Sequence, residues 1–250
     1  MRQTYRKPAS RKIPMDTQTD CSTQEGLIYD ASLWSSDQAR VAFGLDQQIA
    51  AVQAGRGEVR ILQLGFAEAV LRAYRRGGLI ARISRDRYLW VDAESTRPFR
   101  EFRLTAQMHA VGLPVPRPLA ARYTRCGWGY RAELMTERVA ASATLADRLK
   151  RGDTIDWSAV GRMIASVHRF GVWHADLNAT NILLDANQKI WLIDLDRGRM
   201  RSPSRVWQQG NLSRLRRSLH KIDVVKWLPR FETREWPALL ETHQKLMDSP

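Results

Sequence analysis

Cysteine is nearly absent from the chain, and its histidines show no metal-binding spacing. The two cysteines, Cys21 and Cys126, lie far apart without a CxxC motif, and the five histidines form neither HxxxH nor HExxH. Disulfide scaffolds and zinc clusters depend on clustered ligands, so neither is expected here. The low cysteine content fits a protein of a reducing compartment such as the cytoplasm.

Long apolar segments are also missing. No run reaches the roughly 18 apolar residues that a helix needs to cross a bilayer. The chain starts with the basic stretch MRQTYRKPASRK, but polar residues follow it where a secretory signal has its apolar core. We therefore expect no secretory signal, and any contact with a membrane is expected to be peripheral.

Acidic residues are scarce relative to basic ones. The chain has 26 Asp and Glu against 40 Lys and Arg, which gives a formal net charge of +14. Such an excess favours a polyanionic partner, which could be a nucleic acid, an acidic membrane surface or an anionic substrate. Charge alone does not choose among the three.

The patterning divides the chain into a β-rich first half and a helical second half. Residues 1–25 are polar and aperiodic, which predicts a flexible tail. Residues 26–136 contain strand-like runs closed by glycines, together with a helix from Arg97 that ends at Gly112. Residues 137–250 are mainly helical in pattern. We therefore expect an α+β fold with two lobes, a small antiparallel β-rich N-lobe and a helical C-lobe, with a cleft between them.

The segment HADLNATN, which starts at His174, carries polar residues suited to phosphoryl transfer. Asp176 and Asn181 share one loop, and a predicted hairpin of Asn181–Asp185 and Lys189–Ile193 leads to Asp194. The hairpin brings Asn181 and Asp194 to the same end, where two hard oxygens can bind Mg²⁺. Asp176 could accept the proton of an attacking hydroxyl. The alternative, that these are turn residues beside a buried strand, is less well supported because the second aspartate is also present.

The order HxDxxxxN, a short hairpin and IDxD resembles the catalytic and metal-binding loops of the protein-kinase-like superfamily. The resemblance implies ATP as the phosphoryl donor. Gly55 and Gly57 are then candidates for a shortened phosphate-covering turn. Arg72 occupies the strand position of the phosphate-binding cation, where the family has lysine, and Glu101 is its natural ion-pair partner.

Alternatives remain for several of these ATP-binding roles. Arg75 or Arg76 could hold the phosphates in place of Arg72, and Glu94 competes with Glu101. The adenine is expected to dock on the backbone near residues 137–139. His174 is expected to hold the loop backbone and not to act as an acid or base.

The stretch of chain after Asp194 narrows the class of acceptor. It contains no A-P-E tripeptide and no activation segment, and it is too short for a full protein-kinase C-lobe. Protein substrates are therefore not expected, and a hydroxyl of a small molecule or glycolipid is preferred. The segments VLRAYRRGGLI, TRPFREFRL, GLPVPRP, LMTERV, GVWHADLNATNILLD and IDLDRGR resemble the 3-deoxy-D-manno-octulosonic acid (Kdo) kinases of the lipopolysaccharide kinase family.

The family resemblance implies a substrate and a location. It implies ATP- and Mg²⁺-dependent phosphorylation of the Kdo 4-hydroxyl on Kdo–lipid IVA, peripherally at the cytoplasmic face of the inner membrane of a Gram-negative bacterium. Asp176 would match the family's active-site aspartate, and Asn181 and Asp194 its metal ligands. An anionic glycolipid in an acidic membrane surface also accounts for the positive charge, with each nearby Lys or Arg contributing roughly 1 kcal/mol of attraction.

Two basic features are candidates for the lipid contact: the Tyr74–Gly78 turn and the basic stretch Arg199–Arg230. In the second, the leucines at 212, 215 and 219, with Ile222 and Val225, have helical spacing, and we assign them to the core. The arginines at 214, 216 and 217 remain candidate lipid or substrate contacts. Trp207 and Trp227 are either interface anchors or core residues, and Asp196 either binds metal or pairs with Arg197 or Arg199.

Two rival functions also fit part of the pattern. Aminoglycoside and choline phosphotransferases share the HxDxxxxN and IDxD motifs. The positive net charge of this chain, however, suits a cationic substrate poorly. A nucleic-acid-binding protein with a degenerate kinase fold would also be basic. It is disfavoured because the carboxylates are intact and no nucleic-acid-binding motif occurs, so nucleic acid is not the expected partner.

Overall fold

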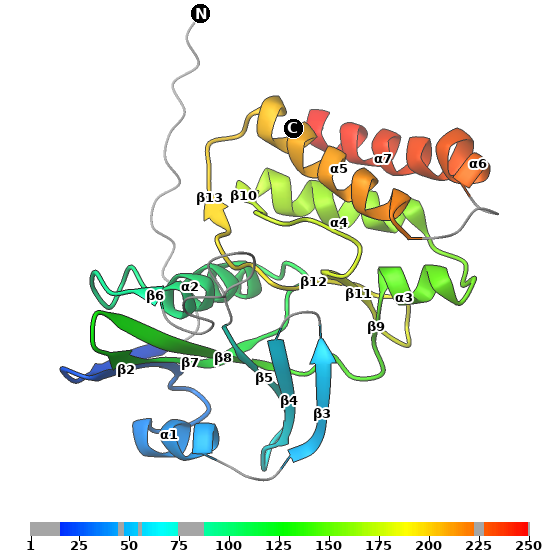
Figure 1. The fold of residues 1–250 in the computed structure, drawn as a ribbon. Helices are drawn as coiled ribbons and strands as arrows, with labels where there is room; N and C mark the ends of the chain where they lie inside the picture. The colour runs from blue at the N-terminus through cyan, green and yellow to red at the C-terminus, as the bar shows by residue number, and fades with distance from the viewer. Residues whose placement is uncertain (1–15, 45–47, 55–56, 75–87, 223–227, 250) are drawn as a thin grey trace, which may run out of the picture.

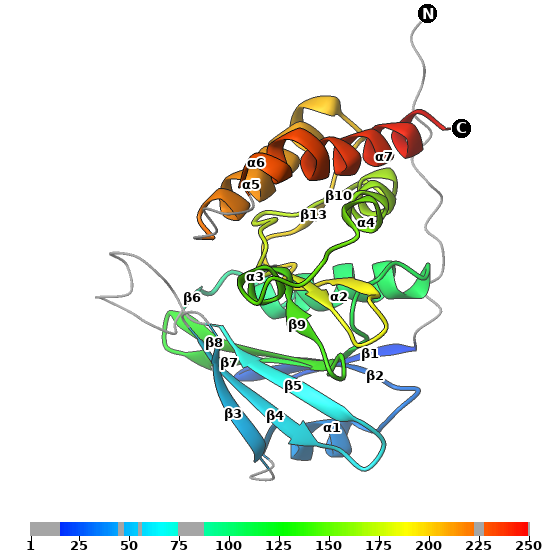
Figure 2. The ribbon, with the colours of Figure 1, turned by 90° about the vertical axis from the view of Figure 1, so that its right-hand side faces the viewer.

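The computed structural model describes residues 16–44, 48–54, 57–74, 88–222 and 228–249, which form two lobes. A sheet makes up the N-terminal lobe, and helices make up most of the C-terminal lobe (Figure 1). Helix α2, Arg97–Ala110, lies between the sheet and the C-terminal helices (Figures 1 and 2). The predicted α+β fold with a β-rich N-lobe and a helical C-lobe is confirmed. Strand β8 of the sheet ends at Glu137, and a domain boundary between residues 136 and 137 stays a prediction.

The described strands of the N-lobe pair antiparallel in the order β1-β2-β7-β8-β5-β4-β3, with β6 beside β8. They are β1 Thr17–Cys21, β2 Glu25–Asp30, β3 Gln48–Ala54, β4 Gly57–Gln63, β5 Glu68–Ala73, β6 Tyr88–Leu89, β7 Pro118–Cys126 and β8 Gly129–Glu137. Arg72 of β5 lies opposite Val59 of β4 and Leu134 of β8. The start of β4, the end of β5 and the start of β8 therefore share one end of the sheet, called here the Arg72 end.

Strand β1 corrects the expected tail where residues 16–25 are described; residues 1–15 lie outside the described residues. Thr17–Cys21 pairs with β2 in continuous register, from Thr17 opposite Asp30 to Cys21 opposite Gly26. Its side chains are mostly exposed, so this edge strand carries no apolar alternation that a sequence pattern could reveal. Backbone pairing holds it, and an ion pair of 2.9 Å between Arg40 and Asp20 adds a side-chain contact.

Each face of the sheet is covered by one helix. Helix α1, Ser36–Gly44, packs through Phe43 on the face that carries Leu27 and Tyr29. Helix α2 packs through Phe99 and Phe102 on the face that carries Ile28, as the alternation of side chains along β2 requires. The predicted start of α2 at Arg97 is confirmed. Gly112, with φ +76°, donates its N–H to the carbonyl of His109 and so ends the helix as expected.

The C-lobe is built on one hydrophobic core. Its elements are β9 Ala143–Thr144, α3 Leu145–Lys150, α4 Trp157–Arg169, β10 Val172–Trp173, β11 Ile182–Leu184, β12 Ile190–Leu192, β13 Arg199–Met200, α5 Arg205–His220, α6 Leu228–Arg230, a π-helical turn Phe231–Glu235 and α7 Trp236–Asp248. The buried side chains of Leu212, Leu215 and Leu219 join the core, which confirms their assignment. Trp207 is also buried, against His168, whereas Val225 and Trp227 lie outside the described residues.

Candidate active site

The loop His174–Asn181 joins β10 to β11 and is shaped by one of its own side chains. Oδ1 of Asn178 accepts hydrogen bonds from the amides of Thr180 (2.8 Å) and Asn181 (3.1 Å), and from the Thr180 hydroxyl (2.6 Å). Such bonds from an Asn side chain to the backbone just after it fix a tight turn. Sequence reasoning did not single out Asn178, although an Asn followed by small polar residues is a signal for this turn.

His174 holds the loop from inside. Its side chain is buried, its Nε2 lies 3.0 Å from the carbonyl oxygen of Ile193, and its Nδ1 lies 3.1 Å from the amide nitrogen of Asp176. A carbonyl oxygen can only accept, so Nε2 carries the proton and Nδ1 accepts from the amide. Burial lowers the pKa of His174, which keeps the ring neutral in this arrangement. These contacts are those of a positioning residue.

The predicted hairpin brings Asn181 and Asp194 to one end. Ile182 lies opposite Leu192, and the Ile193 amide donates to the Asn181 carbonyl at 3.0 Å. Nδ2 of Asn181 donates to the Asp176 carbonyl at 2.9 Å, which leaves Oδ1 as its candidate ligand atom. Asp194 has φ +59°, a conformation that costs free energy in a non-glycine residue and is concentrated at functional sites.

Arg72 joins three parts of the site. Its Nη2 donates to both carboxylate oxygens of Glu101, at 2.6 and 2.7 Å, and its Nη1 donates to Oδ1 of Asp194 at 2.7 Å. The Tyr74 hydroxyl donates to the same Glu101 carboxylate. The structure thus brings the predicted pair of Arg72 and Glu101 together, whereas the competing Glu94 pairs with Arg103.

The environment of Glu101 is buried and charged. Its side chain is only 3% exposed, and burial raises the pKa of the carboxyl while the Arg72 guanidinium opposes the shift. Burial beside this carboxylate also raises the pKa of Tyr74 well above its ordinary value, so the hydroxyl stays protonated and donates. Tyr74 therefore belongs to this cluster and not to a membrane-facing turn. Arg75–Gly78 of that predicted turn lie outside the described residues.

Asp196 pairs with a residue that sequence reasoning had not considered. Nε of Arg97, in the first turn of α2, donates to Oδ1 of Asp196 at 2.7 Å. The Arg97 guanidinium also lies 4.6 Å from the ring centre of Tyr88. The expected partners Arg197 and Arg199 are therefore replaced by Arg97. Two ion pairs, Arg72 with Asp194 and Arg97 with Asp196, tie the N-lobe to the segment after β12.

The His174–Asn181 loop has hydrogen-bond partners on helix α5, and sequence reasoning did not predict these partners. Asn211 accepts from the His174 amide (3.2 Å) and donates to the His174 carbonyl (2.7 Å), and the Ser218 hydroxyl accepts from the Ala179 amide (3.0 Å). Between them, Nη1 of Arg214 lies 3.0 Å from Oδ1 of Asp176. Arg216 pairs with Glu232 instead, and contact of these arginines with lipid or substrate stays a prediction.

The remaining site predictions fall on backbone or outside the described residues. Gly55 lies outside them, and Gly57 starts β4 opposite Ala54. In the predicted adenine segment, the amide of Glu137 donates to Arg117 and that of Arg138 donates to Glu68, each at 2.8 Å. These two amides are therefore engaged within the protein, and adenine docking on residues 137–139 stays a prediction.

The donor set at Asn181 and Asp194 is chemically suited to Mg²⁺. An amide oxygen and a carboxylate are hard ligands, and Mg²⁺ in nucleotide sites takes few protein ligands and fills its shell with phosphates and water. Across the described ranges, no cluster of three or more His, Cys, Asp and Glu side chains could hold a metal by itself. The pair therefore fits a metal that arrives with a nucleotide better than a resident metal ion.

A sheet lobe and a helical lobe that meet at Arg72, Asp194 and the His174–Asn181 loop define the protein-kinase-like class of phosphotransferases. The profile of the lipopolysaccharide kinase (Kdo/WaaP) family matches residues 44–243. The chain belongs to this family, as the resemblance of its motifs predicted.

Named relatives agree with the family match. A 3-deoxy-D-manno-octulosonic acid kinase of Xanthomonas campestris pv. campestris (strain B100) is 47% identical over 208 residues, covering 80% of this chain and 84% of the relative. The protein of the same name from Stenotrophomonas maltophilia (strain R551-3) is 51% identical over 171 residues, covering 68% and 69%. A solved structure of WbdD is 16% identical with a TM-score of 0.46, and its alignment covers 81% of this chain but 46% of that one.

Proposed function

We propose that this protein transfers the γ-phosphoryl group of ATP to the 4-hydroxyl of Kdo in Kdo–lipid IVA. The observation that carries the proposal is the Arg72 guanidinium, which joins Glu101 to Asp194 beside the Asp176 loop. In protein kinases a Lys–Glu ion pair and a metal-binding Asp position the nucleotide phosphates, and we assign these parts to Arg72, Glu101 and Asp194. The acceptor is supported by relatives named 3-deoxy-D-manno-octulosonic acid kinase at 47% and 51% identity.

The roles of the side chains follow from their contacts. Asp176 takes the proton of the acceptor hydroxyl while the hydroxyl oxygen bonds to the γ-phosphorus and the bond to the leaving ADP oxygen breaks. Arg72 contacts the ATP phosphates and is held by Glu101. Gly55 and Gly57 are the glycines proposed from the sequence to cover the phosphates. Asn181 and Asp194 would hold Mg²⁺, which neutralises phosphate charge when bound. His174 accepts from the Asp176 amide and holds its backbone, and Asn178 donates to the Asp176 carboxylate.

We also propose that the protein works peripherally at the cytoplasmic face of the inner membrane. The part of the chain that the structure describes contains no helix long and apolar enough to span a bilayer. The support comes from the Arg72 end of the sheet, where Leu89, Val91 and Trp128 are 71%, 71% and 92% exposed. Exposed Trp and Leu beside arginine suit the interface of an anionic lipid layer.

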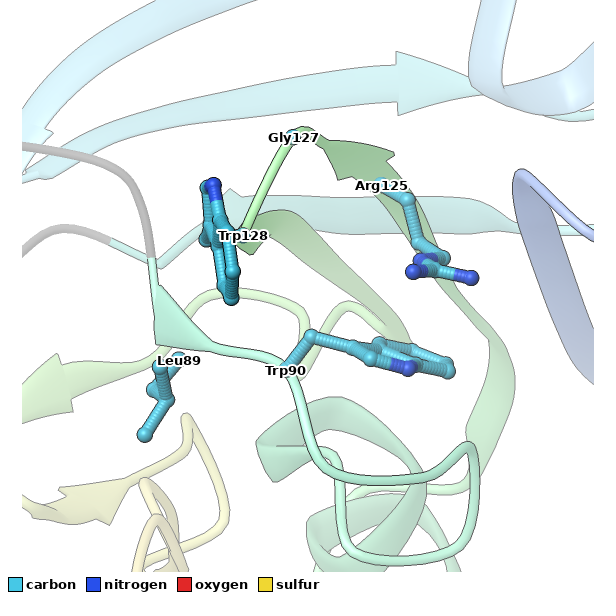
Figure 3. A pocket seen from close by; sticks show the side chains of 5 residues that line it. All are labelled: Leu89, Trp90, Arg125, Gly127 and Trp128. Carbon is cyan, nitrogen blue, oxygen red and sulfur yellow. The ribbon is translucent and has the colours of Figure 1, made fainter.

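Leu89 and Trp128 line a shallow hollow at the β7–β8 turn, together with Trp90, Arg125 and Gly127. Figure 3 shows Trp128 and Leu89 at its edge, with Arg125 facing Trp90. The hollow has a volume of about 350 Å³, and the Arg125 guanidinium lies 4.7 Å from the ring centre of Trp90. We call the exposed side chains of Leu89, Val91 and Trp128 the apolar rim. The rim shares its end of the sheet with Gly57 and Arg72, so lipid bound there would lie on the same side of the N-lobe as the site.

Mass spectrometry of Kdo–lipid IVA after incubation with the purified protein and Mg-ATP tests the proposal. We expect a mass increase of one phosphate that disappears in Asp176→Asn. Asp156→Asn is the matched control, because Asp156 is a surface carboxylate that caps α4 and Asn can replace it as a cap. No phosphate on the lipid with the wild-type protein would overturn the acceptor assignment and direct the search to soluble sugars and aminoglycosides.

A further inference from the structure

We propose that Arg214 of helix α5 is a catalytic residue that binds the phosphoryl group as it passes from ATP to the acceptor. This inference rests on the proposed kinase function and adds a residue outside the recognised motifs. Arg214 lies 38 positions after Asp176 in the chain, yet its Nη1 is 3.0 Å from Oδ1 of that carboxylate.

Helix α5 is fixed against the loop on both sides of Arg214. Asn211 makes two hydrogen bonds with the His174 backbone, and Ser218 accepts one from the Ala179 amide. Positions 211, 214 and 218 are spaced by three and four residues, so they share one face of the helix. Because Asn211 and Ser218 hold the helix against the loop, the Arg214 side chain is positioned beside Asp176.

The His174–Asn181 loop itself supplies no cation to Asp176. HADLNATN contains neither Lys nor Arg, and His174 is buried with its ring neutral in both of its hydrogen bonds. Two positions after Asp176 stands Asn178, whose Nδ2 donates to Oδ2 of Asp176 at 3.1 Å and whose Oδ1 shapes the turn. Among the described residues, Arg214 is therefore the positive group in hydrogen-bond contact with the proposed proton acceptor.

Fold stability does not account for this pair. The side chains of Arg214 and Asp176 are 47% and 58% exposed, and exposed ion pairs contribute little. A pair of the same kind exists elsewhere: Arg162 lies 3.1 Å from Asp156, with exposures of 54% and 60%. The two pairs differ in location, because only Arg214 faces the reacting loop.

A cation beside Asp176 would neutralise charge on the phosphoryl group during the transfer. An acceptor hydroxyl within hydrogen-bond reach of Asp176 lies next to Arg214, and the phosphorus that it attacks lies one bond further on. The phosphoryl group carries its charge on three oxygens, which a guanidinium can bind in a bidentate fork. As the new P–O bond forms, Asp176 gains the proton and loses its charge. Arg214 is then released from Asp176 and can bind the phosphoryl oxygens.

The test compares Arg214→Gln, Arg214→Lys and Arg162→Gln with the wild type. We measure kcat and KM for ATP and for Kdo–lipid IVA, ATP hydrolysis without acceptor, and the thermal midpoint. For Arg214→Gln we expect kcat and acceptor-free hydrolysis to fall by about 10² to 10³, as when one donor to a transition-state oxyanion is removed. The thermal midpoint and the KM for the lipid should change little, Arg214→Lys should recover part of kcat, and Arg162→Gln should match the wild type.

Three outcomes would overturn the proposal. An unchanged kcat in Arg214→Gln would remove Arg214 from the reaction. A raised KM for the lipid with unchanged ATP hydrolysis would assign Arg214 to an anionic group of the acceptor instead. An equal loss in Arg162→Gln would show a general effect of surface charge. If the wild type does not phosphorylate Kdo–lipid IVA, hydrolysis of ATP still tests Arg214, so failure of the acceptor assignment is distinguishable from failure of this inference.

Discussion

Arg72 and Asp194 lie 122 residues apart in the chain, and their side chains meet at 2.7 Å. The contact joins the predicted phosphate-binding cation on β5 to the predicted metal ligand after β12. Glu101 binds the other nitrogen of the same guanidinium. One side chain therefore links the sheet, helix α2 and the C-lobe, so changes at Arg72 should affect stability as well as nucleotide binding.

The first prediction concerns the Arg72–Glu101 pair. Arg72→Gln leaves the buried Glu101 carboxylate without its cation, and we expect the free energy of unfolding to fall by about 2–4 kcal/mol. Glu101→Gln should be destabilising too, and the double variant should show a coupling of about 1–3 kcal/mol in urea unfolding. The exposed pair Arg103–Glu94 is the control, with a coupling of at most about 1 kcal/mol. Additive effects at Arg72 and Glu101 would contradict the linkage.

The second prediction separates two neighbouring aspartates. Asp194→Asn keeps an oxygen for Arg72 but removes the charge that a metal needs. We expect the Mg²⁺ concentration for half-maximal activity to rise at least about tenfold, since even residues that only orient metal ligands cost 10–100-fold. Asp196→Asn should leave the Mg²⁺ titration unchanged, because Arg97 contacts both carboxylate oxygens of Asp196, whereas Arg72 contacts only Oδ1 of Asp194. Equal shifts in the two variants would refute the distinct roles.

Local spacing made part of the site predictable. The offset from Asp176 to Asn181 and the short hairpin to Asp194 depend on neighbouring residues, whose geometry a few hydrogen bonds fix. The resemblance to the protein-kinase-like superfamily likewise indicated Arg72 and Glu101. The α+β class followed from the change between strand-like runs in the first half of the chain and a helical pattern in the second.

The missed contacts are those that only the tertiary fold creates. Arg97 and Asp196 are 99 residues apart, and the sequence offered the nearer Arg197 and Arg199 as partners. Several arginines of α5 are equivalent in a helical pattern, and only the anchoring by Asn211 and Ser218 directs Arg214 to the loop. Strand β1 was missed because its exposed edge has no apolar alternation.

The third prediction concerns the apolar rim. We expect the Leu89→Ser/Trp128→Ser double variant to bind phosphatidylethanolamine–phosphatidylglycerol vesicles roughly 30-fold more weakly, since each exposed side chain that no longer enters the lipid should cost about 1 kcal/mol. Phe66→Ser is the matched control. Phe66 is 51% exposed, but it lies in the β4–β5 turn at the opposite end of the sheet. Sedimentation with the vesicles measures binding, and equal losses in the control and the rim variant would exclude the rim as the contact.

The last prediction concerns stability against pH. Nδ1 of His168 lies 2.9 Å from Nε2 of His243 inside the C-lobe, where one ring donates and the other accepts. Burial, with the neighbouring His243 adding to it, lowers the pKa of His168 to about 3. Between pH 6.5 and 3 the unfolded chain therefore binds a proton at this residue that the folded chain rejects.

The stability associated with this neutral pair is complete above about pH 6.5 and is lost as the pH falls towards 3. The free energy of unfolding should decrease by up to about 1.4 kcal/mol per pH unit from His168 alone. In urea unfolding between pH 7 and 4, His168→Gln should lower the free energy of unfolding at pH 7. It should also reduce the slope of that free energy against pH, by up to the equivalent of one proton taken up on unfolding. Burial also lowers the pKa of His174, so this residue continues to contribute to the pH dependence of the free energy of unfolding in the variant. A His168→Gln profile parallel to that of the wild type would show that the histidine pair does not set the acid limit of the fold.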